Sequence, residues 1–219
     1  GFSFSQCEDL VDGTRNLDSF VYLSSILKTC AVNLSKTAND IRLMSSGPKA
    51  GIAELILPQE QPGSSIMPGK VNPVIPEVMN QVCFQIFGND VTITKAAEAG
   101  QLELNVFEPV LFFNLFQSIQ ILTNGIRTFI DNCIAGIQVN EEDCKYWLTR
   151  SVGVVTALSP HIGYKVAAEI AKLSLKTGKP VYDLVLEQGL LEKEKLDVIL
   201  NPFEMTKPGI AGKELLSRD

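Results

Sequence analysis

Apolar residues recur at helical spacing along three long stretches of the chain. In the first stretch, residues 20–41, they follow one another in alternating steps of three and four, as in a helix packed in a bundle. The seam consists of Phe20, Leu23, Leu27, Cys30, Leu34, Thr37 and Ile41. We expect Asn16 or Asp18 to cap the start of this helix. Residues 45–48, Ser-Ser-Gly-Pro, predict its end, because glycine permits a positive φ and proline cannot continue a helix.

Two further long helices are predicted downstream. Pro73 and Pro76 suit the first turn of a helix, and an apolar series continues from them to about Gly100. A third helix should run from about Pro109 to Ala135, with apolar residues over most of its circumference. We expect that helix to be buried centrally, as core or as an interface with other chains. Its main stripe consists of Phe112, Leu115, Phe116, Ile119, Leu122, Ile126, Phe129 and Cys133.

The remaining segments are short. Residues 53–57 are apolar and are followed by a proline, which predicts an extended or hairpin-like segment. After Gly136, glycine and proline separate shorter helical patterns. These patterns cover residues 141–150, 164–176, 181–188 and 192–200. Because no series of alternating strands occurs, we predict an all-α fold, with a long antiparallel helical bundle over residues 1–140 and a small helical domain over residues 141–219.

The composition excludes several classes of partner. The 219 residues are 45% hydrophobic and 20% charged, and the formal net charge is −6. Because the chain has no excess of positive charge, neither nucleic acid nor an anionic membrane surface is an expected partner. The most apolar region, residues 106–128, is interrupted by polar side chains, so no membrane span is expected.

The cysteines and the first residues bear on the origin of the chain. Five cysteines, an odd number, are scattered without a C-x-x-C pair, which argues against a disulfide framework. A reducing cytoplasmic location is therefore expected. The sequence begins at Gly1 with no initiator Met and no signal-peptide pattern, so we expect a piece of a longer protein.

Residues 63–72, Gly-Ser-Ser-Ile-Met-Pro-Gly-Lys-Val-Asn, carry the clearest chemical pattern. Their glycine spacing and the valine after Lys70 exclude a Walker-type phosphate loop. Ser-His hydrolysis is disfavoured, since His161 is the only histidine and no G-x-S-x-G motif occurs. Metal chemistry lacks ligands at suitable spacing, so no metal is expected. The hydroxyls, cation and amide that remain can hold a carboxylate and stabilise the charge that develops when an adjacent proton is removed. The helix predicted from Pro73 should add unpaired N–H groups that attract an anion.

The run Gly-Ser-Ser-Ile-Met-Pro-Gly-Lys-Val-Asn-Pro, residues 63–73, resembles the signature of the aspartase/fumarase superfamily, and the likeness extends over essentially the whole chain. Residues 101–110 and 201–210 are more similar to its aspartase branch than to its fumarase branch, in which a Lys typically replaces Glu108. The resemblance implies that the chain is the C-terminal part of a bundle enzyme that eliminates ammonia from L-aspartate to give fumarate. It also implies that no cofactor is needed, and that a homotetramer shares each active site among three subunits.

Carried over to this sequence, the resemblance assigns roles to several residues of the predicted catalytic loop, residues 59–72. It makes Ser64 the base that removes the C3 proton, with Gly63 supporting the loop. Lys70 and Asn72 would hold the carboxylate of the enediolate-like intermediate. The substrate-binding set is Ser65, Ile66, Met67, Lys70 and Asn72. Glu77 corresponds to a position that orients an active-site histidine.

Several alternatives stay open at this stage. Complete members of the superfamily are about twice this length and carry further substrate-binding residues, so the 219 residues alone are expected to be inactive. A class II fumarase would use the same loop to remove a proton from malate. In a non-catalytic helical assembly module, these residues would serve only oligomerisation. Glu77 can also be read as a favourable acid in the first turn of a helix. His161 is expected to be a cap or surface residue, and the cysteines small core residues.

Overall fold

The computed structural model describes residues 1–47, 49–61 and 71–216. The chain divides into two compact units, Gly1–Asn140 and Glu141–Asp219. Both units are built mainly from packed α-helices, which confirms the predicted all-α fold.

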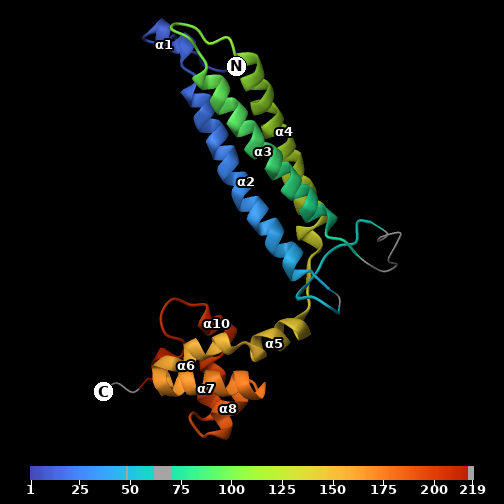
Figure 1. The fold of residues 1–219 in the computed structure, drawn as a ribbon, viewed down its shortest axis with the longest axis vertical. Helices are drawn as coiled ribbons and strands as arrows, with labels where there is room; N and C mark the ends of the chain where they lie inside the picture. Colours follow the sequence, from blue (N-terminus) through green and yellow to red (C-terminus); the bar gives the residue numbers. More distant parts are fainter. Residues whose placement is uncertain (48, 62–70, 217–219) are drawn as a thin grey trace. The chain divides into compact units, whose positions relative to one another are not determined.

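Three long helices form the first unit. They are α2 (Asp18–Met44), α3 (Val74–Glu98) and α4 (Glu108–Asn132), and a short helix α1 (Leu10–Arg15) precedes them. Figure 1 shows α3 running antiparallel to both α2 and α4, and α3 packs against each of them. The three predicted helices are thus confirmed to within a few residues. Their main core consists of Ala31, Ala38, Ile41, Met79, Cys83, Ile86, Leu122, Phe129 and Cys133.

The predicted cap of α2 is wrong. The N-cap residue is Leu17, which makes no side-chain cap hydrogen bond, while the carboxylate of Asp18 accepts only from the neighbouring Ser19 N–H. Leu17 is buried in a second cluster with Ile93 and Leu111 of the neighbouring helices. Apolar burial therefore sets the entry into α2. At the other end, Gly47 has the positive φ that the sequence predicted.

The short apolar segment between α2 and α3 is extended, as predicted, but it does not form a hairpin. β1 (Leu55–Ile56) pairs antiparallel with β2 (Gln138–Val139), which follows α4 and a turn of 3₁₀ helix at Ile134–Gly136. The partner strand lies far along the sequence, where no local turn signal could indicate it. This pairing brings the end of the first unit back beside the end of α2.

Within the chain by itself, α4 buries only part of its apolar surface. Leu111, Leu115, Leu122 and Phe129 are buried, because they face the other two long helices. Other large apolar side chains of the same helix, among them Phe113 and Phe116, are more than half exposed. Among the long helices that the structure describes, α2 and α3 pack against α4, and they leave part of its apolar surface exposed.

Asn105 joins the end of α3 to the start of α4. Its side chain is buried, and Nδ2 donates to the carbonyl oxygens of Ala96 at 2.9 Å and Ala97 at 3.2 Å. Its Oδ1 accepts from the N–H of Phe107 at 2.8 Å. The amide thus satisfies carbonyl groups that the end of a helix leaves unpaired, and it fixes the entry into the next helix.

Replacing Asn105 by alanine is expected to lower the free energy of unfolding by about 2–3 kcal/mol, because one buried and two partly buried hydrogen bonds lose their partner. Urea unfolding followed by circular dichroism measures the change. Asn16→Ala, at an exposed asparagine, is the matched control and should stay within about 0.5 kcal/mol of the unsubstituted chain. Equal stability of the two variants would contradict the role given to Asn105.

The second unit is a cluster of short helices. They are α5 (Glu141–Arg150), α6 (Val155–Ile162), α7 (Tyr164–Thr177), α8 (Val181–Glu187), α9 (Lys193–Ile199) and α10 (Pro202–Met205), with 3₁₀ turns at Val152–Val154 and Lys213–Leu215. The four helices expected from the sequence are present. Helix α6 was not expected, since Pro160 suggested a break but lies inside it. The core consists of Leu158, Ile170, Val181, Leu184, Val185, Leu196 and Ile199.

Within the described parts of the chain, no helix is both long and apolar enough to cross a membrane. All five cysteines are free. Cys83 and Cys133 are buried, as expected for small core residues, whereas Cys7 is exposed. Burial raises the pKa of Cys83 to about 11, and burial together with the nearby charge of Glu60 raises the pKa of Cys133.

These pKa shifts predict an order of thiol reactivity. At pH 8, iodoacetamide is expected to modify Cys7 first, and to reach Cys83 and Cys133 only after unfolding, because both are buried and stay protonated. Peptide mass mapping against time measures this order. Since the native pKa of Cys83 is raised above its ordinary value of 9.0, its contribution to stability is complete below pH 9.0 and is lost as the pH rises towards about 11. Equal labelling rates in native and denatured protein would contradict the prediction.

Candidate functional site

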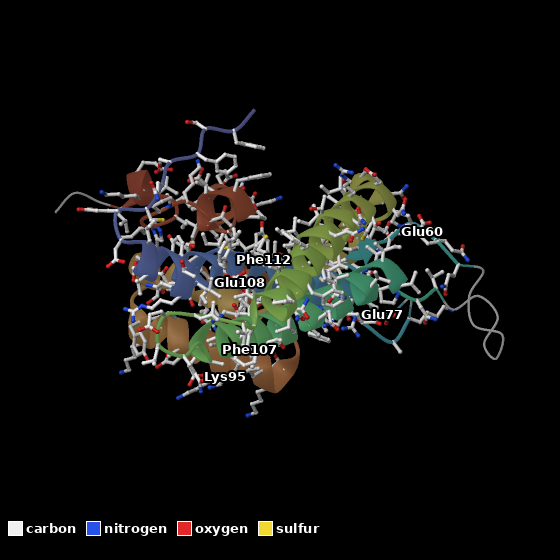
Figure 2. The ribbon with its side chains drawn as sticks, turned by 90° about the horizontal axis from the view of Figure 1, so that it is seen from above. Glu60, Glu77, Lys95, Phe107, Glu108 and Phe112 are labelled. Atoms are coloured by element: carbon white, nitrogen blue, oxygen red, sulfur yellow. The ribbon has the colours of Figure 1, made fainter. Side chains whose placement is uncertain are left out.

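The predicted catalytic loop is described only at its two ends. Gly63, Ser64, Ser65, Ile66, Met67 and Lys70 lie outside the described residues. Asn72 and Glu77 are described, and they mark the point where the chain leaves the loop and enters α3. In Figure 2, Glu60 and Glu77 lie towards one side of the bundle, and Lys95 and Phe107 lie towards the other. The candidate site therefore belongs to one end of the three-helix bundle.

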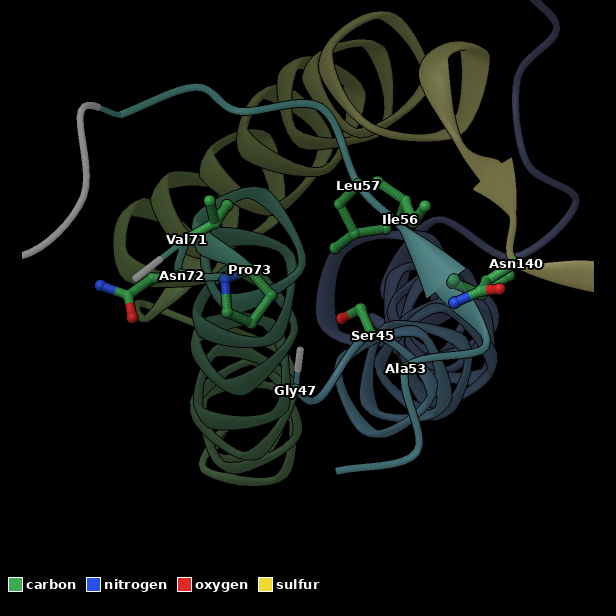
Figure 3. A pocket seen from close by; sticks show the side chains of 10 residues that line it. Ser45, Gly47, Ala53, Ile56, Leu57, Val71, Asn72, Pro73 and Asn140 are labelled. Atoms are coloured by element: carbon green, nitrogen blue, oxygen red, sulfur yellow. The ribbon is translucent and has the colours of Figure 1, made fainter. Parts of the chain in front are cut away.

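A pocket of about 260 Å³ lies where α2 ends, β1 begins and α3 starts. It is lined by Ser45, Gly47, Ala53, Leu55, Ile56, Leu57, Val71, Asn72, Pro73 and Asn140. In Figure 3, Asn72 and Pro73 stand on one side of this pocket, while Ser45 and Ala53 stand on the other. The amide of Asn72 points away from Ser45 and Ala53, towards the outside of the bundle. A ligand held by this amide would thus contact the outer side of the loop exit.

The wall of the pocket opposite Asn72 is a tight turn after α2. The carbonyl of Ser46 accepts from the N–H of Ala53 at 2.8 Å, and its hydroxyl accepts from the N–H of Ile52 at 3.1 Å. Ala53 has a φ of +53°, which is unusual for a residue with a side chain. A Cβ atom on Gly51 would lie 2.3 Å from the Ser46 carbonyl oxygen, so only glycine fits there. The backbone of this wall is therefore closely constrained.

The start of α3 offers fewer backbone donors than the sequence suggested. Pro73 and Pro76 have no N–H group. The N–H of Val74 donates to the carbonyl of Asn72 at 2.9 Å, and that of Glu77 donates to Pro73 at 3.1 Å. The unpaired N–H groups expected at this helix start are therefore absent at the two prolines and already paired at Val74. A positive charge beside the start of α3 is supplied by a side chain of α2.

That side chain is Arg42, which the sequence analysis did not single out. Its Nη2 lies 3.9 Å from Oε1 of Glu77, and its Nη1 donates to Oδ1 of Asn80 at 3.2 Å. Asn80 is buried and donates in turn to the carbonyl and the hydroxyl of Ser35, at 3.1 and 3.0 Å. Arg42 thus ties the end of α2 to the first two turns of α3. No local motif marks it, because the contact depends on how two helices are aligned.

Two further ionisable groups of the described chain have partners of their own. Asp90, in the middle of α3, is buried and accepts from Lys28 Nζ at 2.6 Å and from the Ser24 hydroxyl at 2.7 Å. His161 belongs to the second unit, where its Nε2 donates to the carbonyl of Ala211 at 2.8 Å. Among the residues that the structure describes, no group of His, Cys, Asp and Glu could hold a metal ion.

An antiparallel bundle of long helices, followed in sequence by a unit of short helices, is typical of lyases built on a long bundle. Sequence comparison agrees with this class. Residues 1–88 match the family described as Lyase, and residues 154–207 match the family described as Fumarase C C-terminus. The chain belongs to the aspartase/fumarase superfamily.

Comparison with individual proteins gives a more detailed picture than the family matches. The chain is 58% identical over 218 residues to an aspartate ammonia-lyase of Bacillus subtilis, covering 100% of this chain and 46% of the relative. Two solved structures superpose with a TM-score of 0.86 and cover 94% of this chain: a cobalt-bound fumarate lyase:delta crystallin from Brucella melitensis, 46% identical, and a class II fumarase from Schistosoma mansoni, 40% identical. The chain covers 44% and 43% of those two structures, and it spans less than half the length of the curated relatives it matches.

Proposed function

We propose that this chain forms the catalytic-loop part of an aspartate ammonia-lyase, which eliminates ammonia from L-aspartate to give fumarate. The observation that carries the proposal is the 58% identity to the Bacillus subtilis aspartate ammonia-lyase over 218 residues. Because identity at this level extends through both units, it supports a shared reaction as well as a shared fold.

In the proposed reaction, Ser64 takes the proton from C3 of the substrate as its alkoxide. The electrons of the C3–H bond pass to the adjacent carboxylate, which gives an enediolate-like intermediate. They then form the C2=C3 double bond, while the bond from C2 to the substrate's ammonium group breaks and its electrons leave with ammonia. Lys70 and Asn72 hold the carboxylate next to C3, where negative charge grows in the enediolate-like intermediate. Ser65, Ile66 and Met67 line the loop beside the substrate. No cofactor takes part, since elimination needs only a base and charge stabilisation. The position of Asn72 at the loop exit, with its amide directed outwards, supports this assignment.

We further propose a cytoplasmic homotetramer in which each active site draws on three subunits. The long helices expose large apolar side chains, including Tyr22 at 70%, Val91 at 62% and Phe113 at 65%. Exposed apolar surface on this scale is typical of an interface. The outward direction of the Asn72 amide and the absence of a second histidine from the sequence also favour a site completed by other residues. Light scattering of the assembled enzyme tests the tetramer.

The class II fumarase reaction, in which water leaves malate, is the second candidate. The TM-score of 0.86 to the Schistosoma mansoni fumarase supports it. The sequence identity to that structure is 40%, against 58% to the Bacillus subtilis relative, so ammonia elimination is the better supported reaction.

A hybrid protein tests the proposal. In this hybrid, the chain replaces the matching part of the Bacillus subtilis aspartate ammonia-lyase, and the rest of the relative is retained. We expect the hybrid to form fumarate from L-aspartate, seen by its ultraviolet absorbance, and to leave malate unchanged. Turnover of malate alone would favour the fumarase reaction, and turnover of neither substrate would contradict both.

A further inference from the structure

Arg42 stands at the junction of the two helices that frame the candidate site. Its guanidinium reaches Asn80 at 3.2 Å and Glu77 at 3.9 Å, both from the start of α3. Glu77 and Asn80 are three residues apart, so they share one face of this helix, and Arg42 contacts that face from α2. The same guanidinium lies within 3.4 Å of Oδ1 of Asn39 on its own helix.

The contact to Asn80 fixes the alignment of α2 and α3. The buried amide of Asn80 is fully engaged, since it donates to Ser35 twice and accepts from Arg42. The first turn of α3 is linked to the loop exit by two backbone hydrogen bonds, from Val74 to Asn72 and from Glu77 to Pro73. A shift of α3 against α2 would therefore move Asn72 as well.

The contact to Glu77 has an electrostatic consequence. A carboxylate in the first turn of α3, close to the loop exit, would repel a substrate that carries two carboxylates of its own. Arg42 sets one positive charge beside Glu77, and both side chains are about 40% exposed. Such a half-exposed ion pair contributes little to stability. Its effect on the charge that an incoming dicarboxylate meets is the larger one, because Glu77 lies in the first turn of α3, five positions after Asn72.

We infer that Arg42 is a positioning residue of the lyase site, which aligns the start of α3 and neutralises Glu77 so that a dicarboxylate binds beside Asn72. This inference rests on the proposed function, because it assigns Arg42 a role towards the substrate of that reaction. It adds a residue of α2 to a site that the sequence placed wholly in the loop and the first turn of α3.

The test measures KM for L-aspartate in the hybrid protein. Arg42→Gln removes the charge but keeps an N–H donor for Asn80, and it should raise KM about tenfold, as expected for one uncompensated charge near a bound carboxylate. Adding Glu77→Gln to Arg42→Gln should return KM to near the wild-type value, even though kcat falls. Arg42→Lys should keep KM within about twofold, because the charge remains.

Lys36→Gln is the matched control. Lys36 lies on the same helix and pairs with Asp40, and its side chain is 74% exposed, so KM should not change. KM does not depend on how much of a preparation is folded, so a loss of stability in Arg42→Gln leaves the measurement valid. If Arg42→Gln gives no folded protein, the test uses Arg42→Lys and Glu77→Gln instead. KM should then stay near the wild-type value in Arg42→Lys and fall in Glu77→Gln.

The outcomes separate the inference from the proposed function. An active wild-type hybrid with an unchanged KM in Arg42→Gln would overturn the role of Arg42 alone. A raised KM that Glu77→Gln fails to restore would overturn the neutralisation of Glu77, since the pair would then not act through its charges. A wild-type hybrid that does not convert aspartate would overturn the proposed function, and this inference with it.

Discussion

Ser64→Ala in the hybrid protein is expected to lower kcat for L-aspartate by about 10²–10⁴-fold, the usual contribution of a general base. KM should change far less, because the hydroxyl acts on the C3 proton in the transition state and not on the carboxylates in the bound substrate. Initial rates of fumarate formation over a range of aspartate concentrations give both constants.

Ser25→Ala is the control for this substitution. Ser25 is a half-buried residue of α2, and its hydroxyl donates to the carbonyl of Tyr22 within the helix, far from the loop in sequence. Its loss should leave kcat unchanged. If Ser64→Ala turned over aspartate as fast as this control, Ser64 would not be the base, and the reading of the chain as a non-catalytic assembly module would regain support.

Asn72→Asp should have the second largest effect. The substitution keeps the shape of the side chain but exchanges an N–H donor for a negative charge, so the enediolate-like intermediate loses a partner and gains a repulsion. We expect kcat/KM for aspartate to fall by about 10²–10³-fold, which is typical of the loss of one oxyanion donor. Steady-state kinetics of the hybrid measures the change.

Asn33→Asp provides the matched control, since Asn33 is an exposed residue of α2 and the same charge is introduced there. Its kcat/KM should stay within about twofold of the wild-type value. Equal effects of the two substitutions would mean that net charge, and not a contact at the loop exit, determines the result.

Much of the helical framework could be predicted from the sequence, because burial of one helix face imposes a regular apolar spacing. The bounds of α2, α3 and α4 follow from that spacing to within a few residues. The residues at the helix ends could not be predicted from that spacing. The N-cap residue of α2 is Leu17, which is buried among apolar side chains, whereas capping rules suggested Asn16 or Asp18. Pro160 was interpreted as a break, but a helix of eight residues accommodates it.

The candidate site was predictable only in part. Residues 63–72 carry a distinctive set of side chains within one short segment, so sequence alone can propose Ser64, Lys70 and Asn72. Arg42 lies 30 positions from Asn72 in the sequence, and its contact with Glu77 depends on the alignment of two helices. The apolar breadth of α4 likewise indicates that something covers it but does not identify the partner. Contacts between distant segments are what the sequence pattern leaves open.

The central claim is that the loop of this chain forms one wall of a composite site and needs the rest of the enzyme to act. The most direct test compares fumarate formation from L-aspartate by the 219-residue chain alone and by the hybrid protein, at equal molar concentration. The account predicts turnover by the hybrid and none by the chain alone, with the mass of each preparation verified. Fumarate formation by the chain alone at the rate of the hybrid would contradict it.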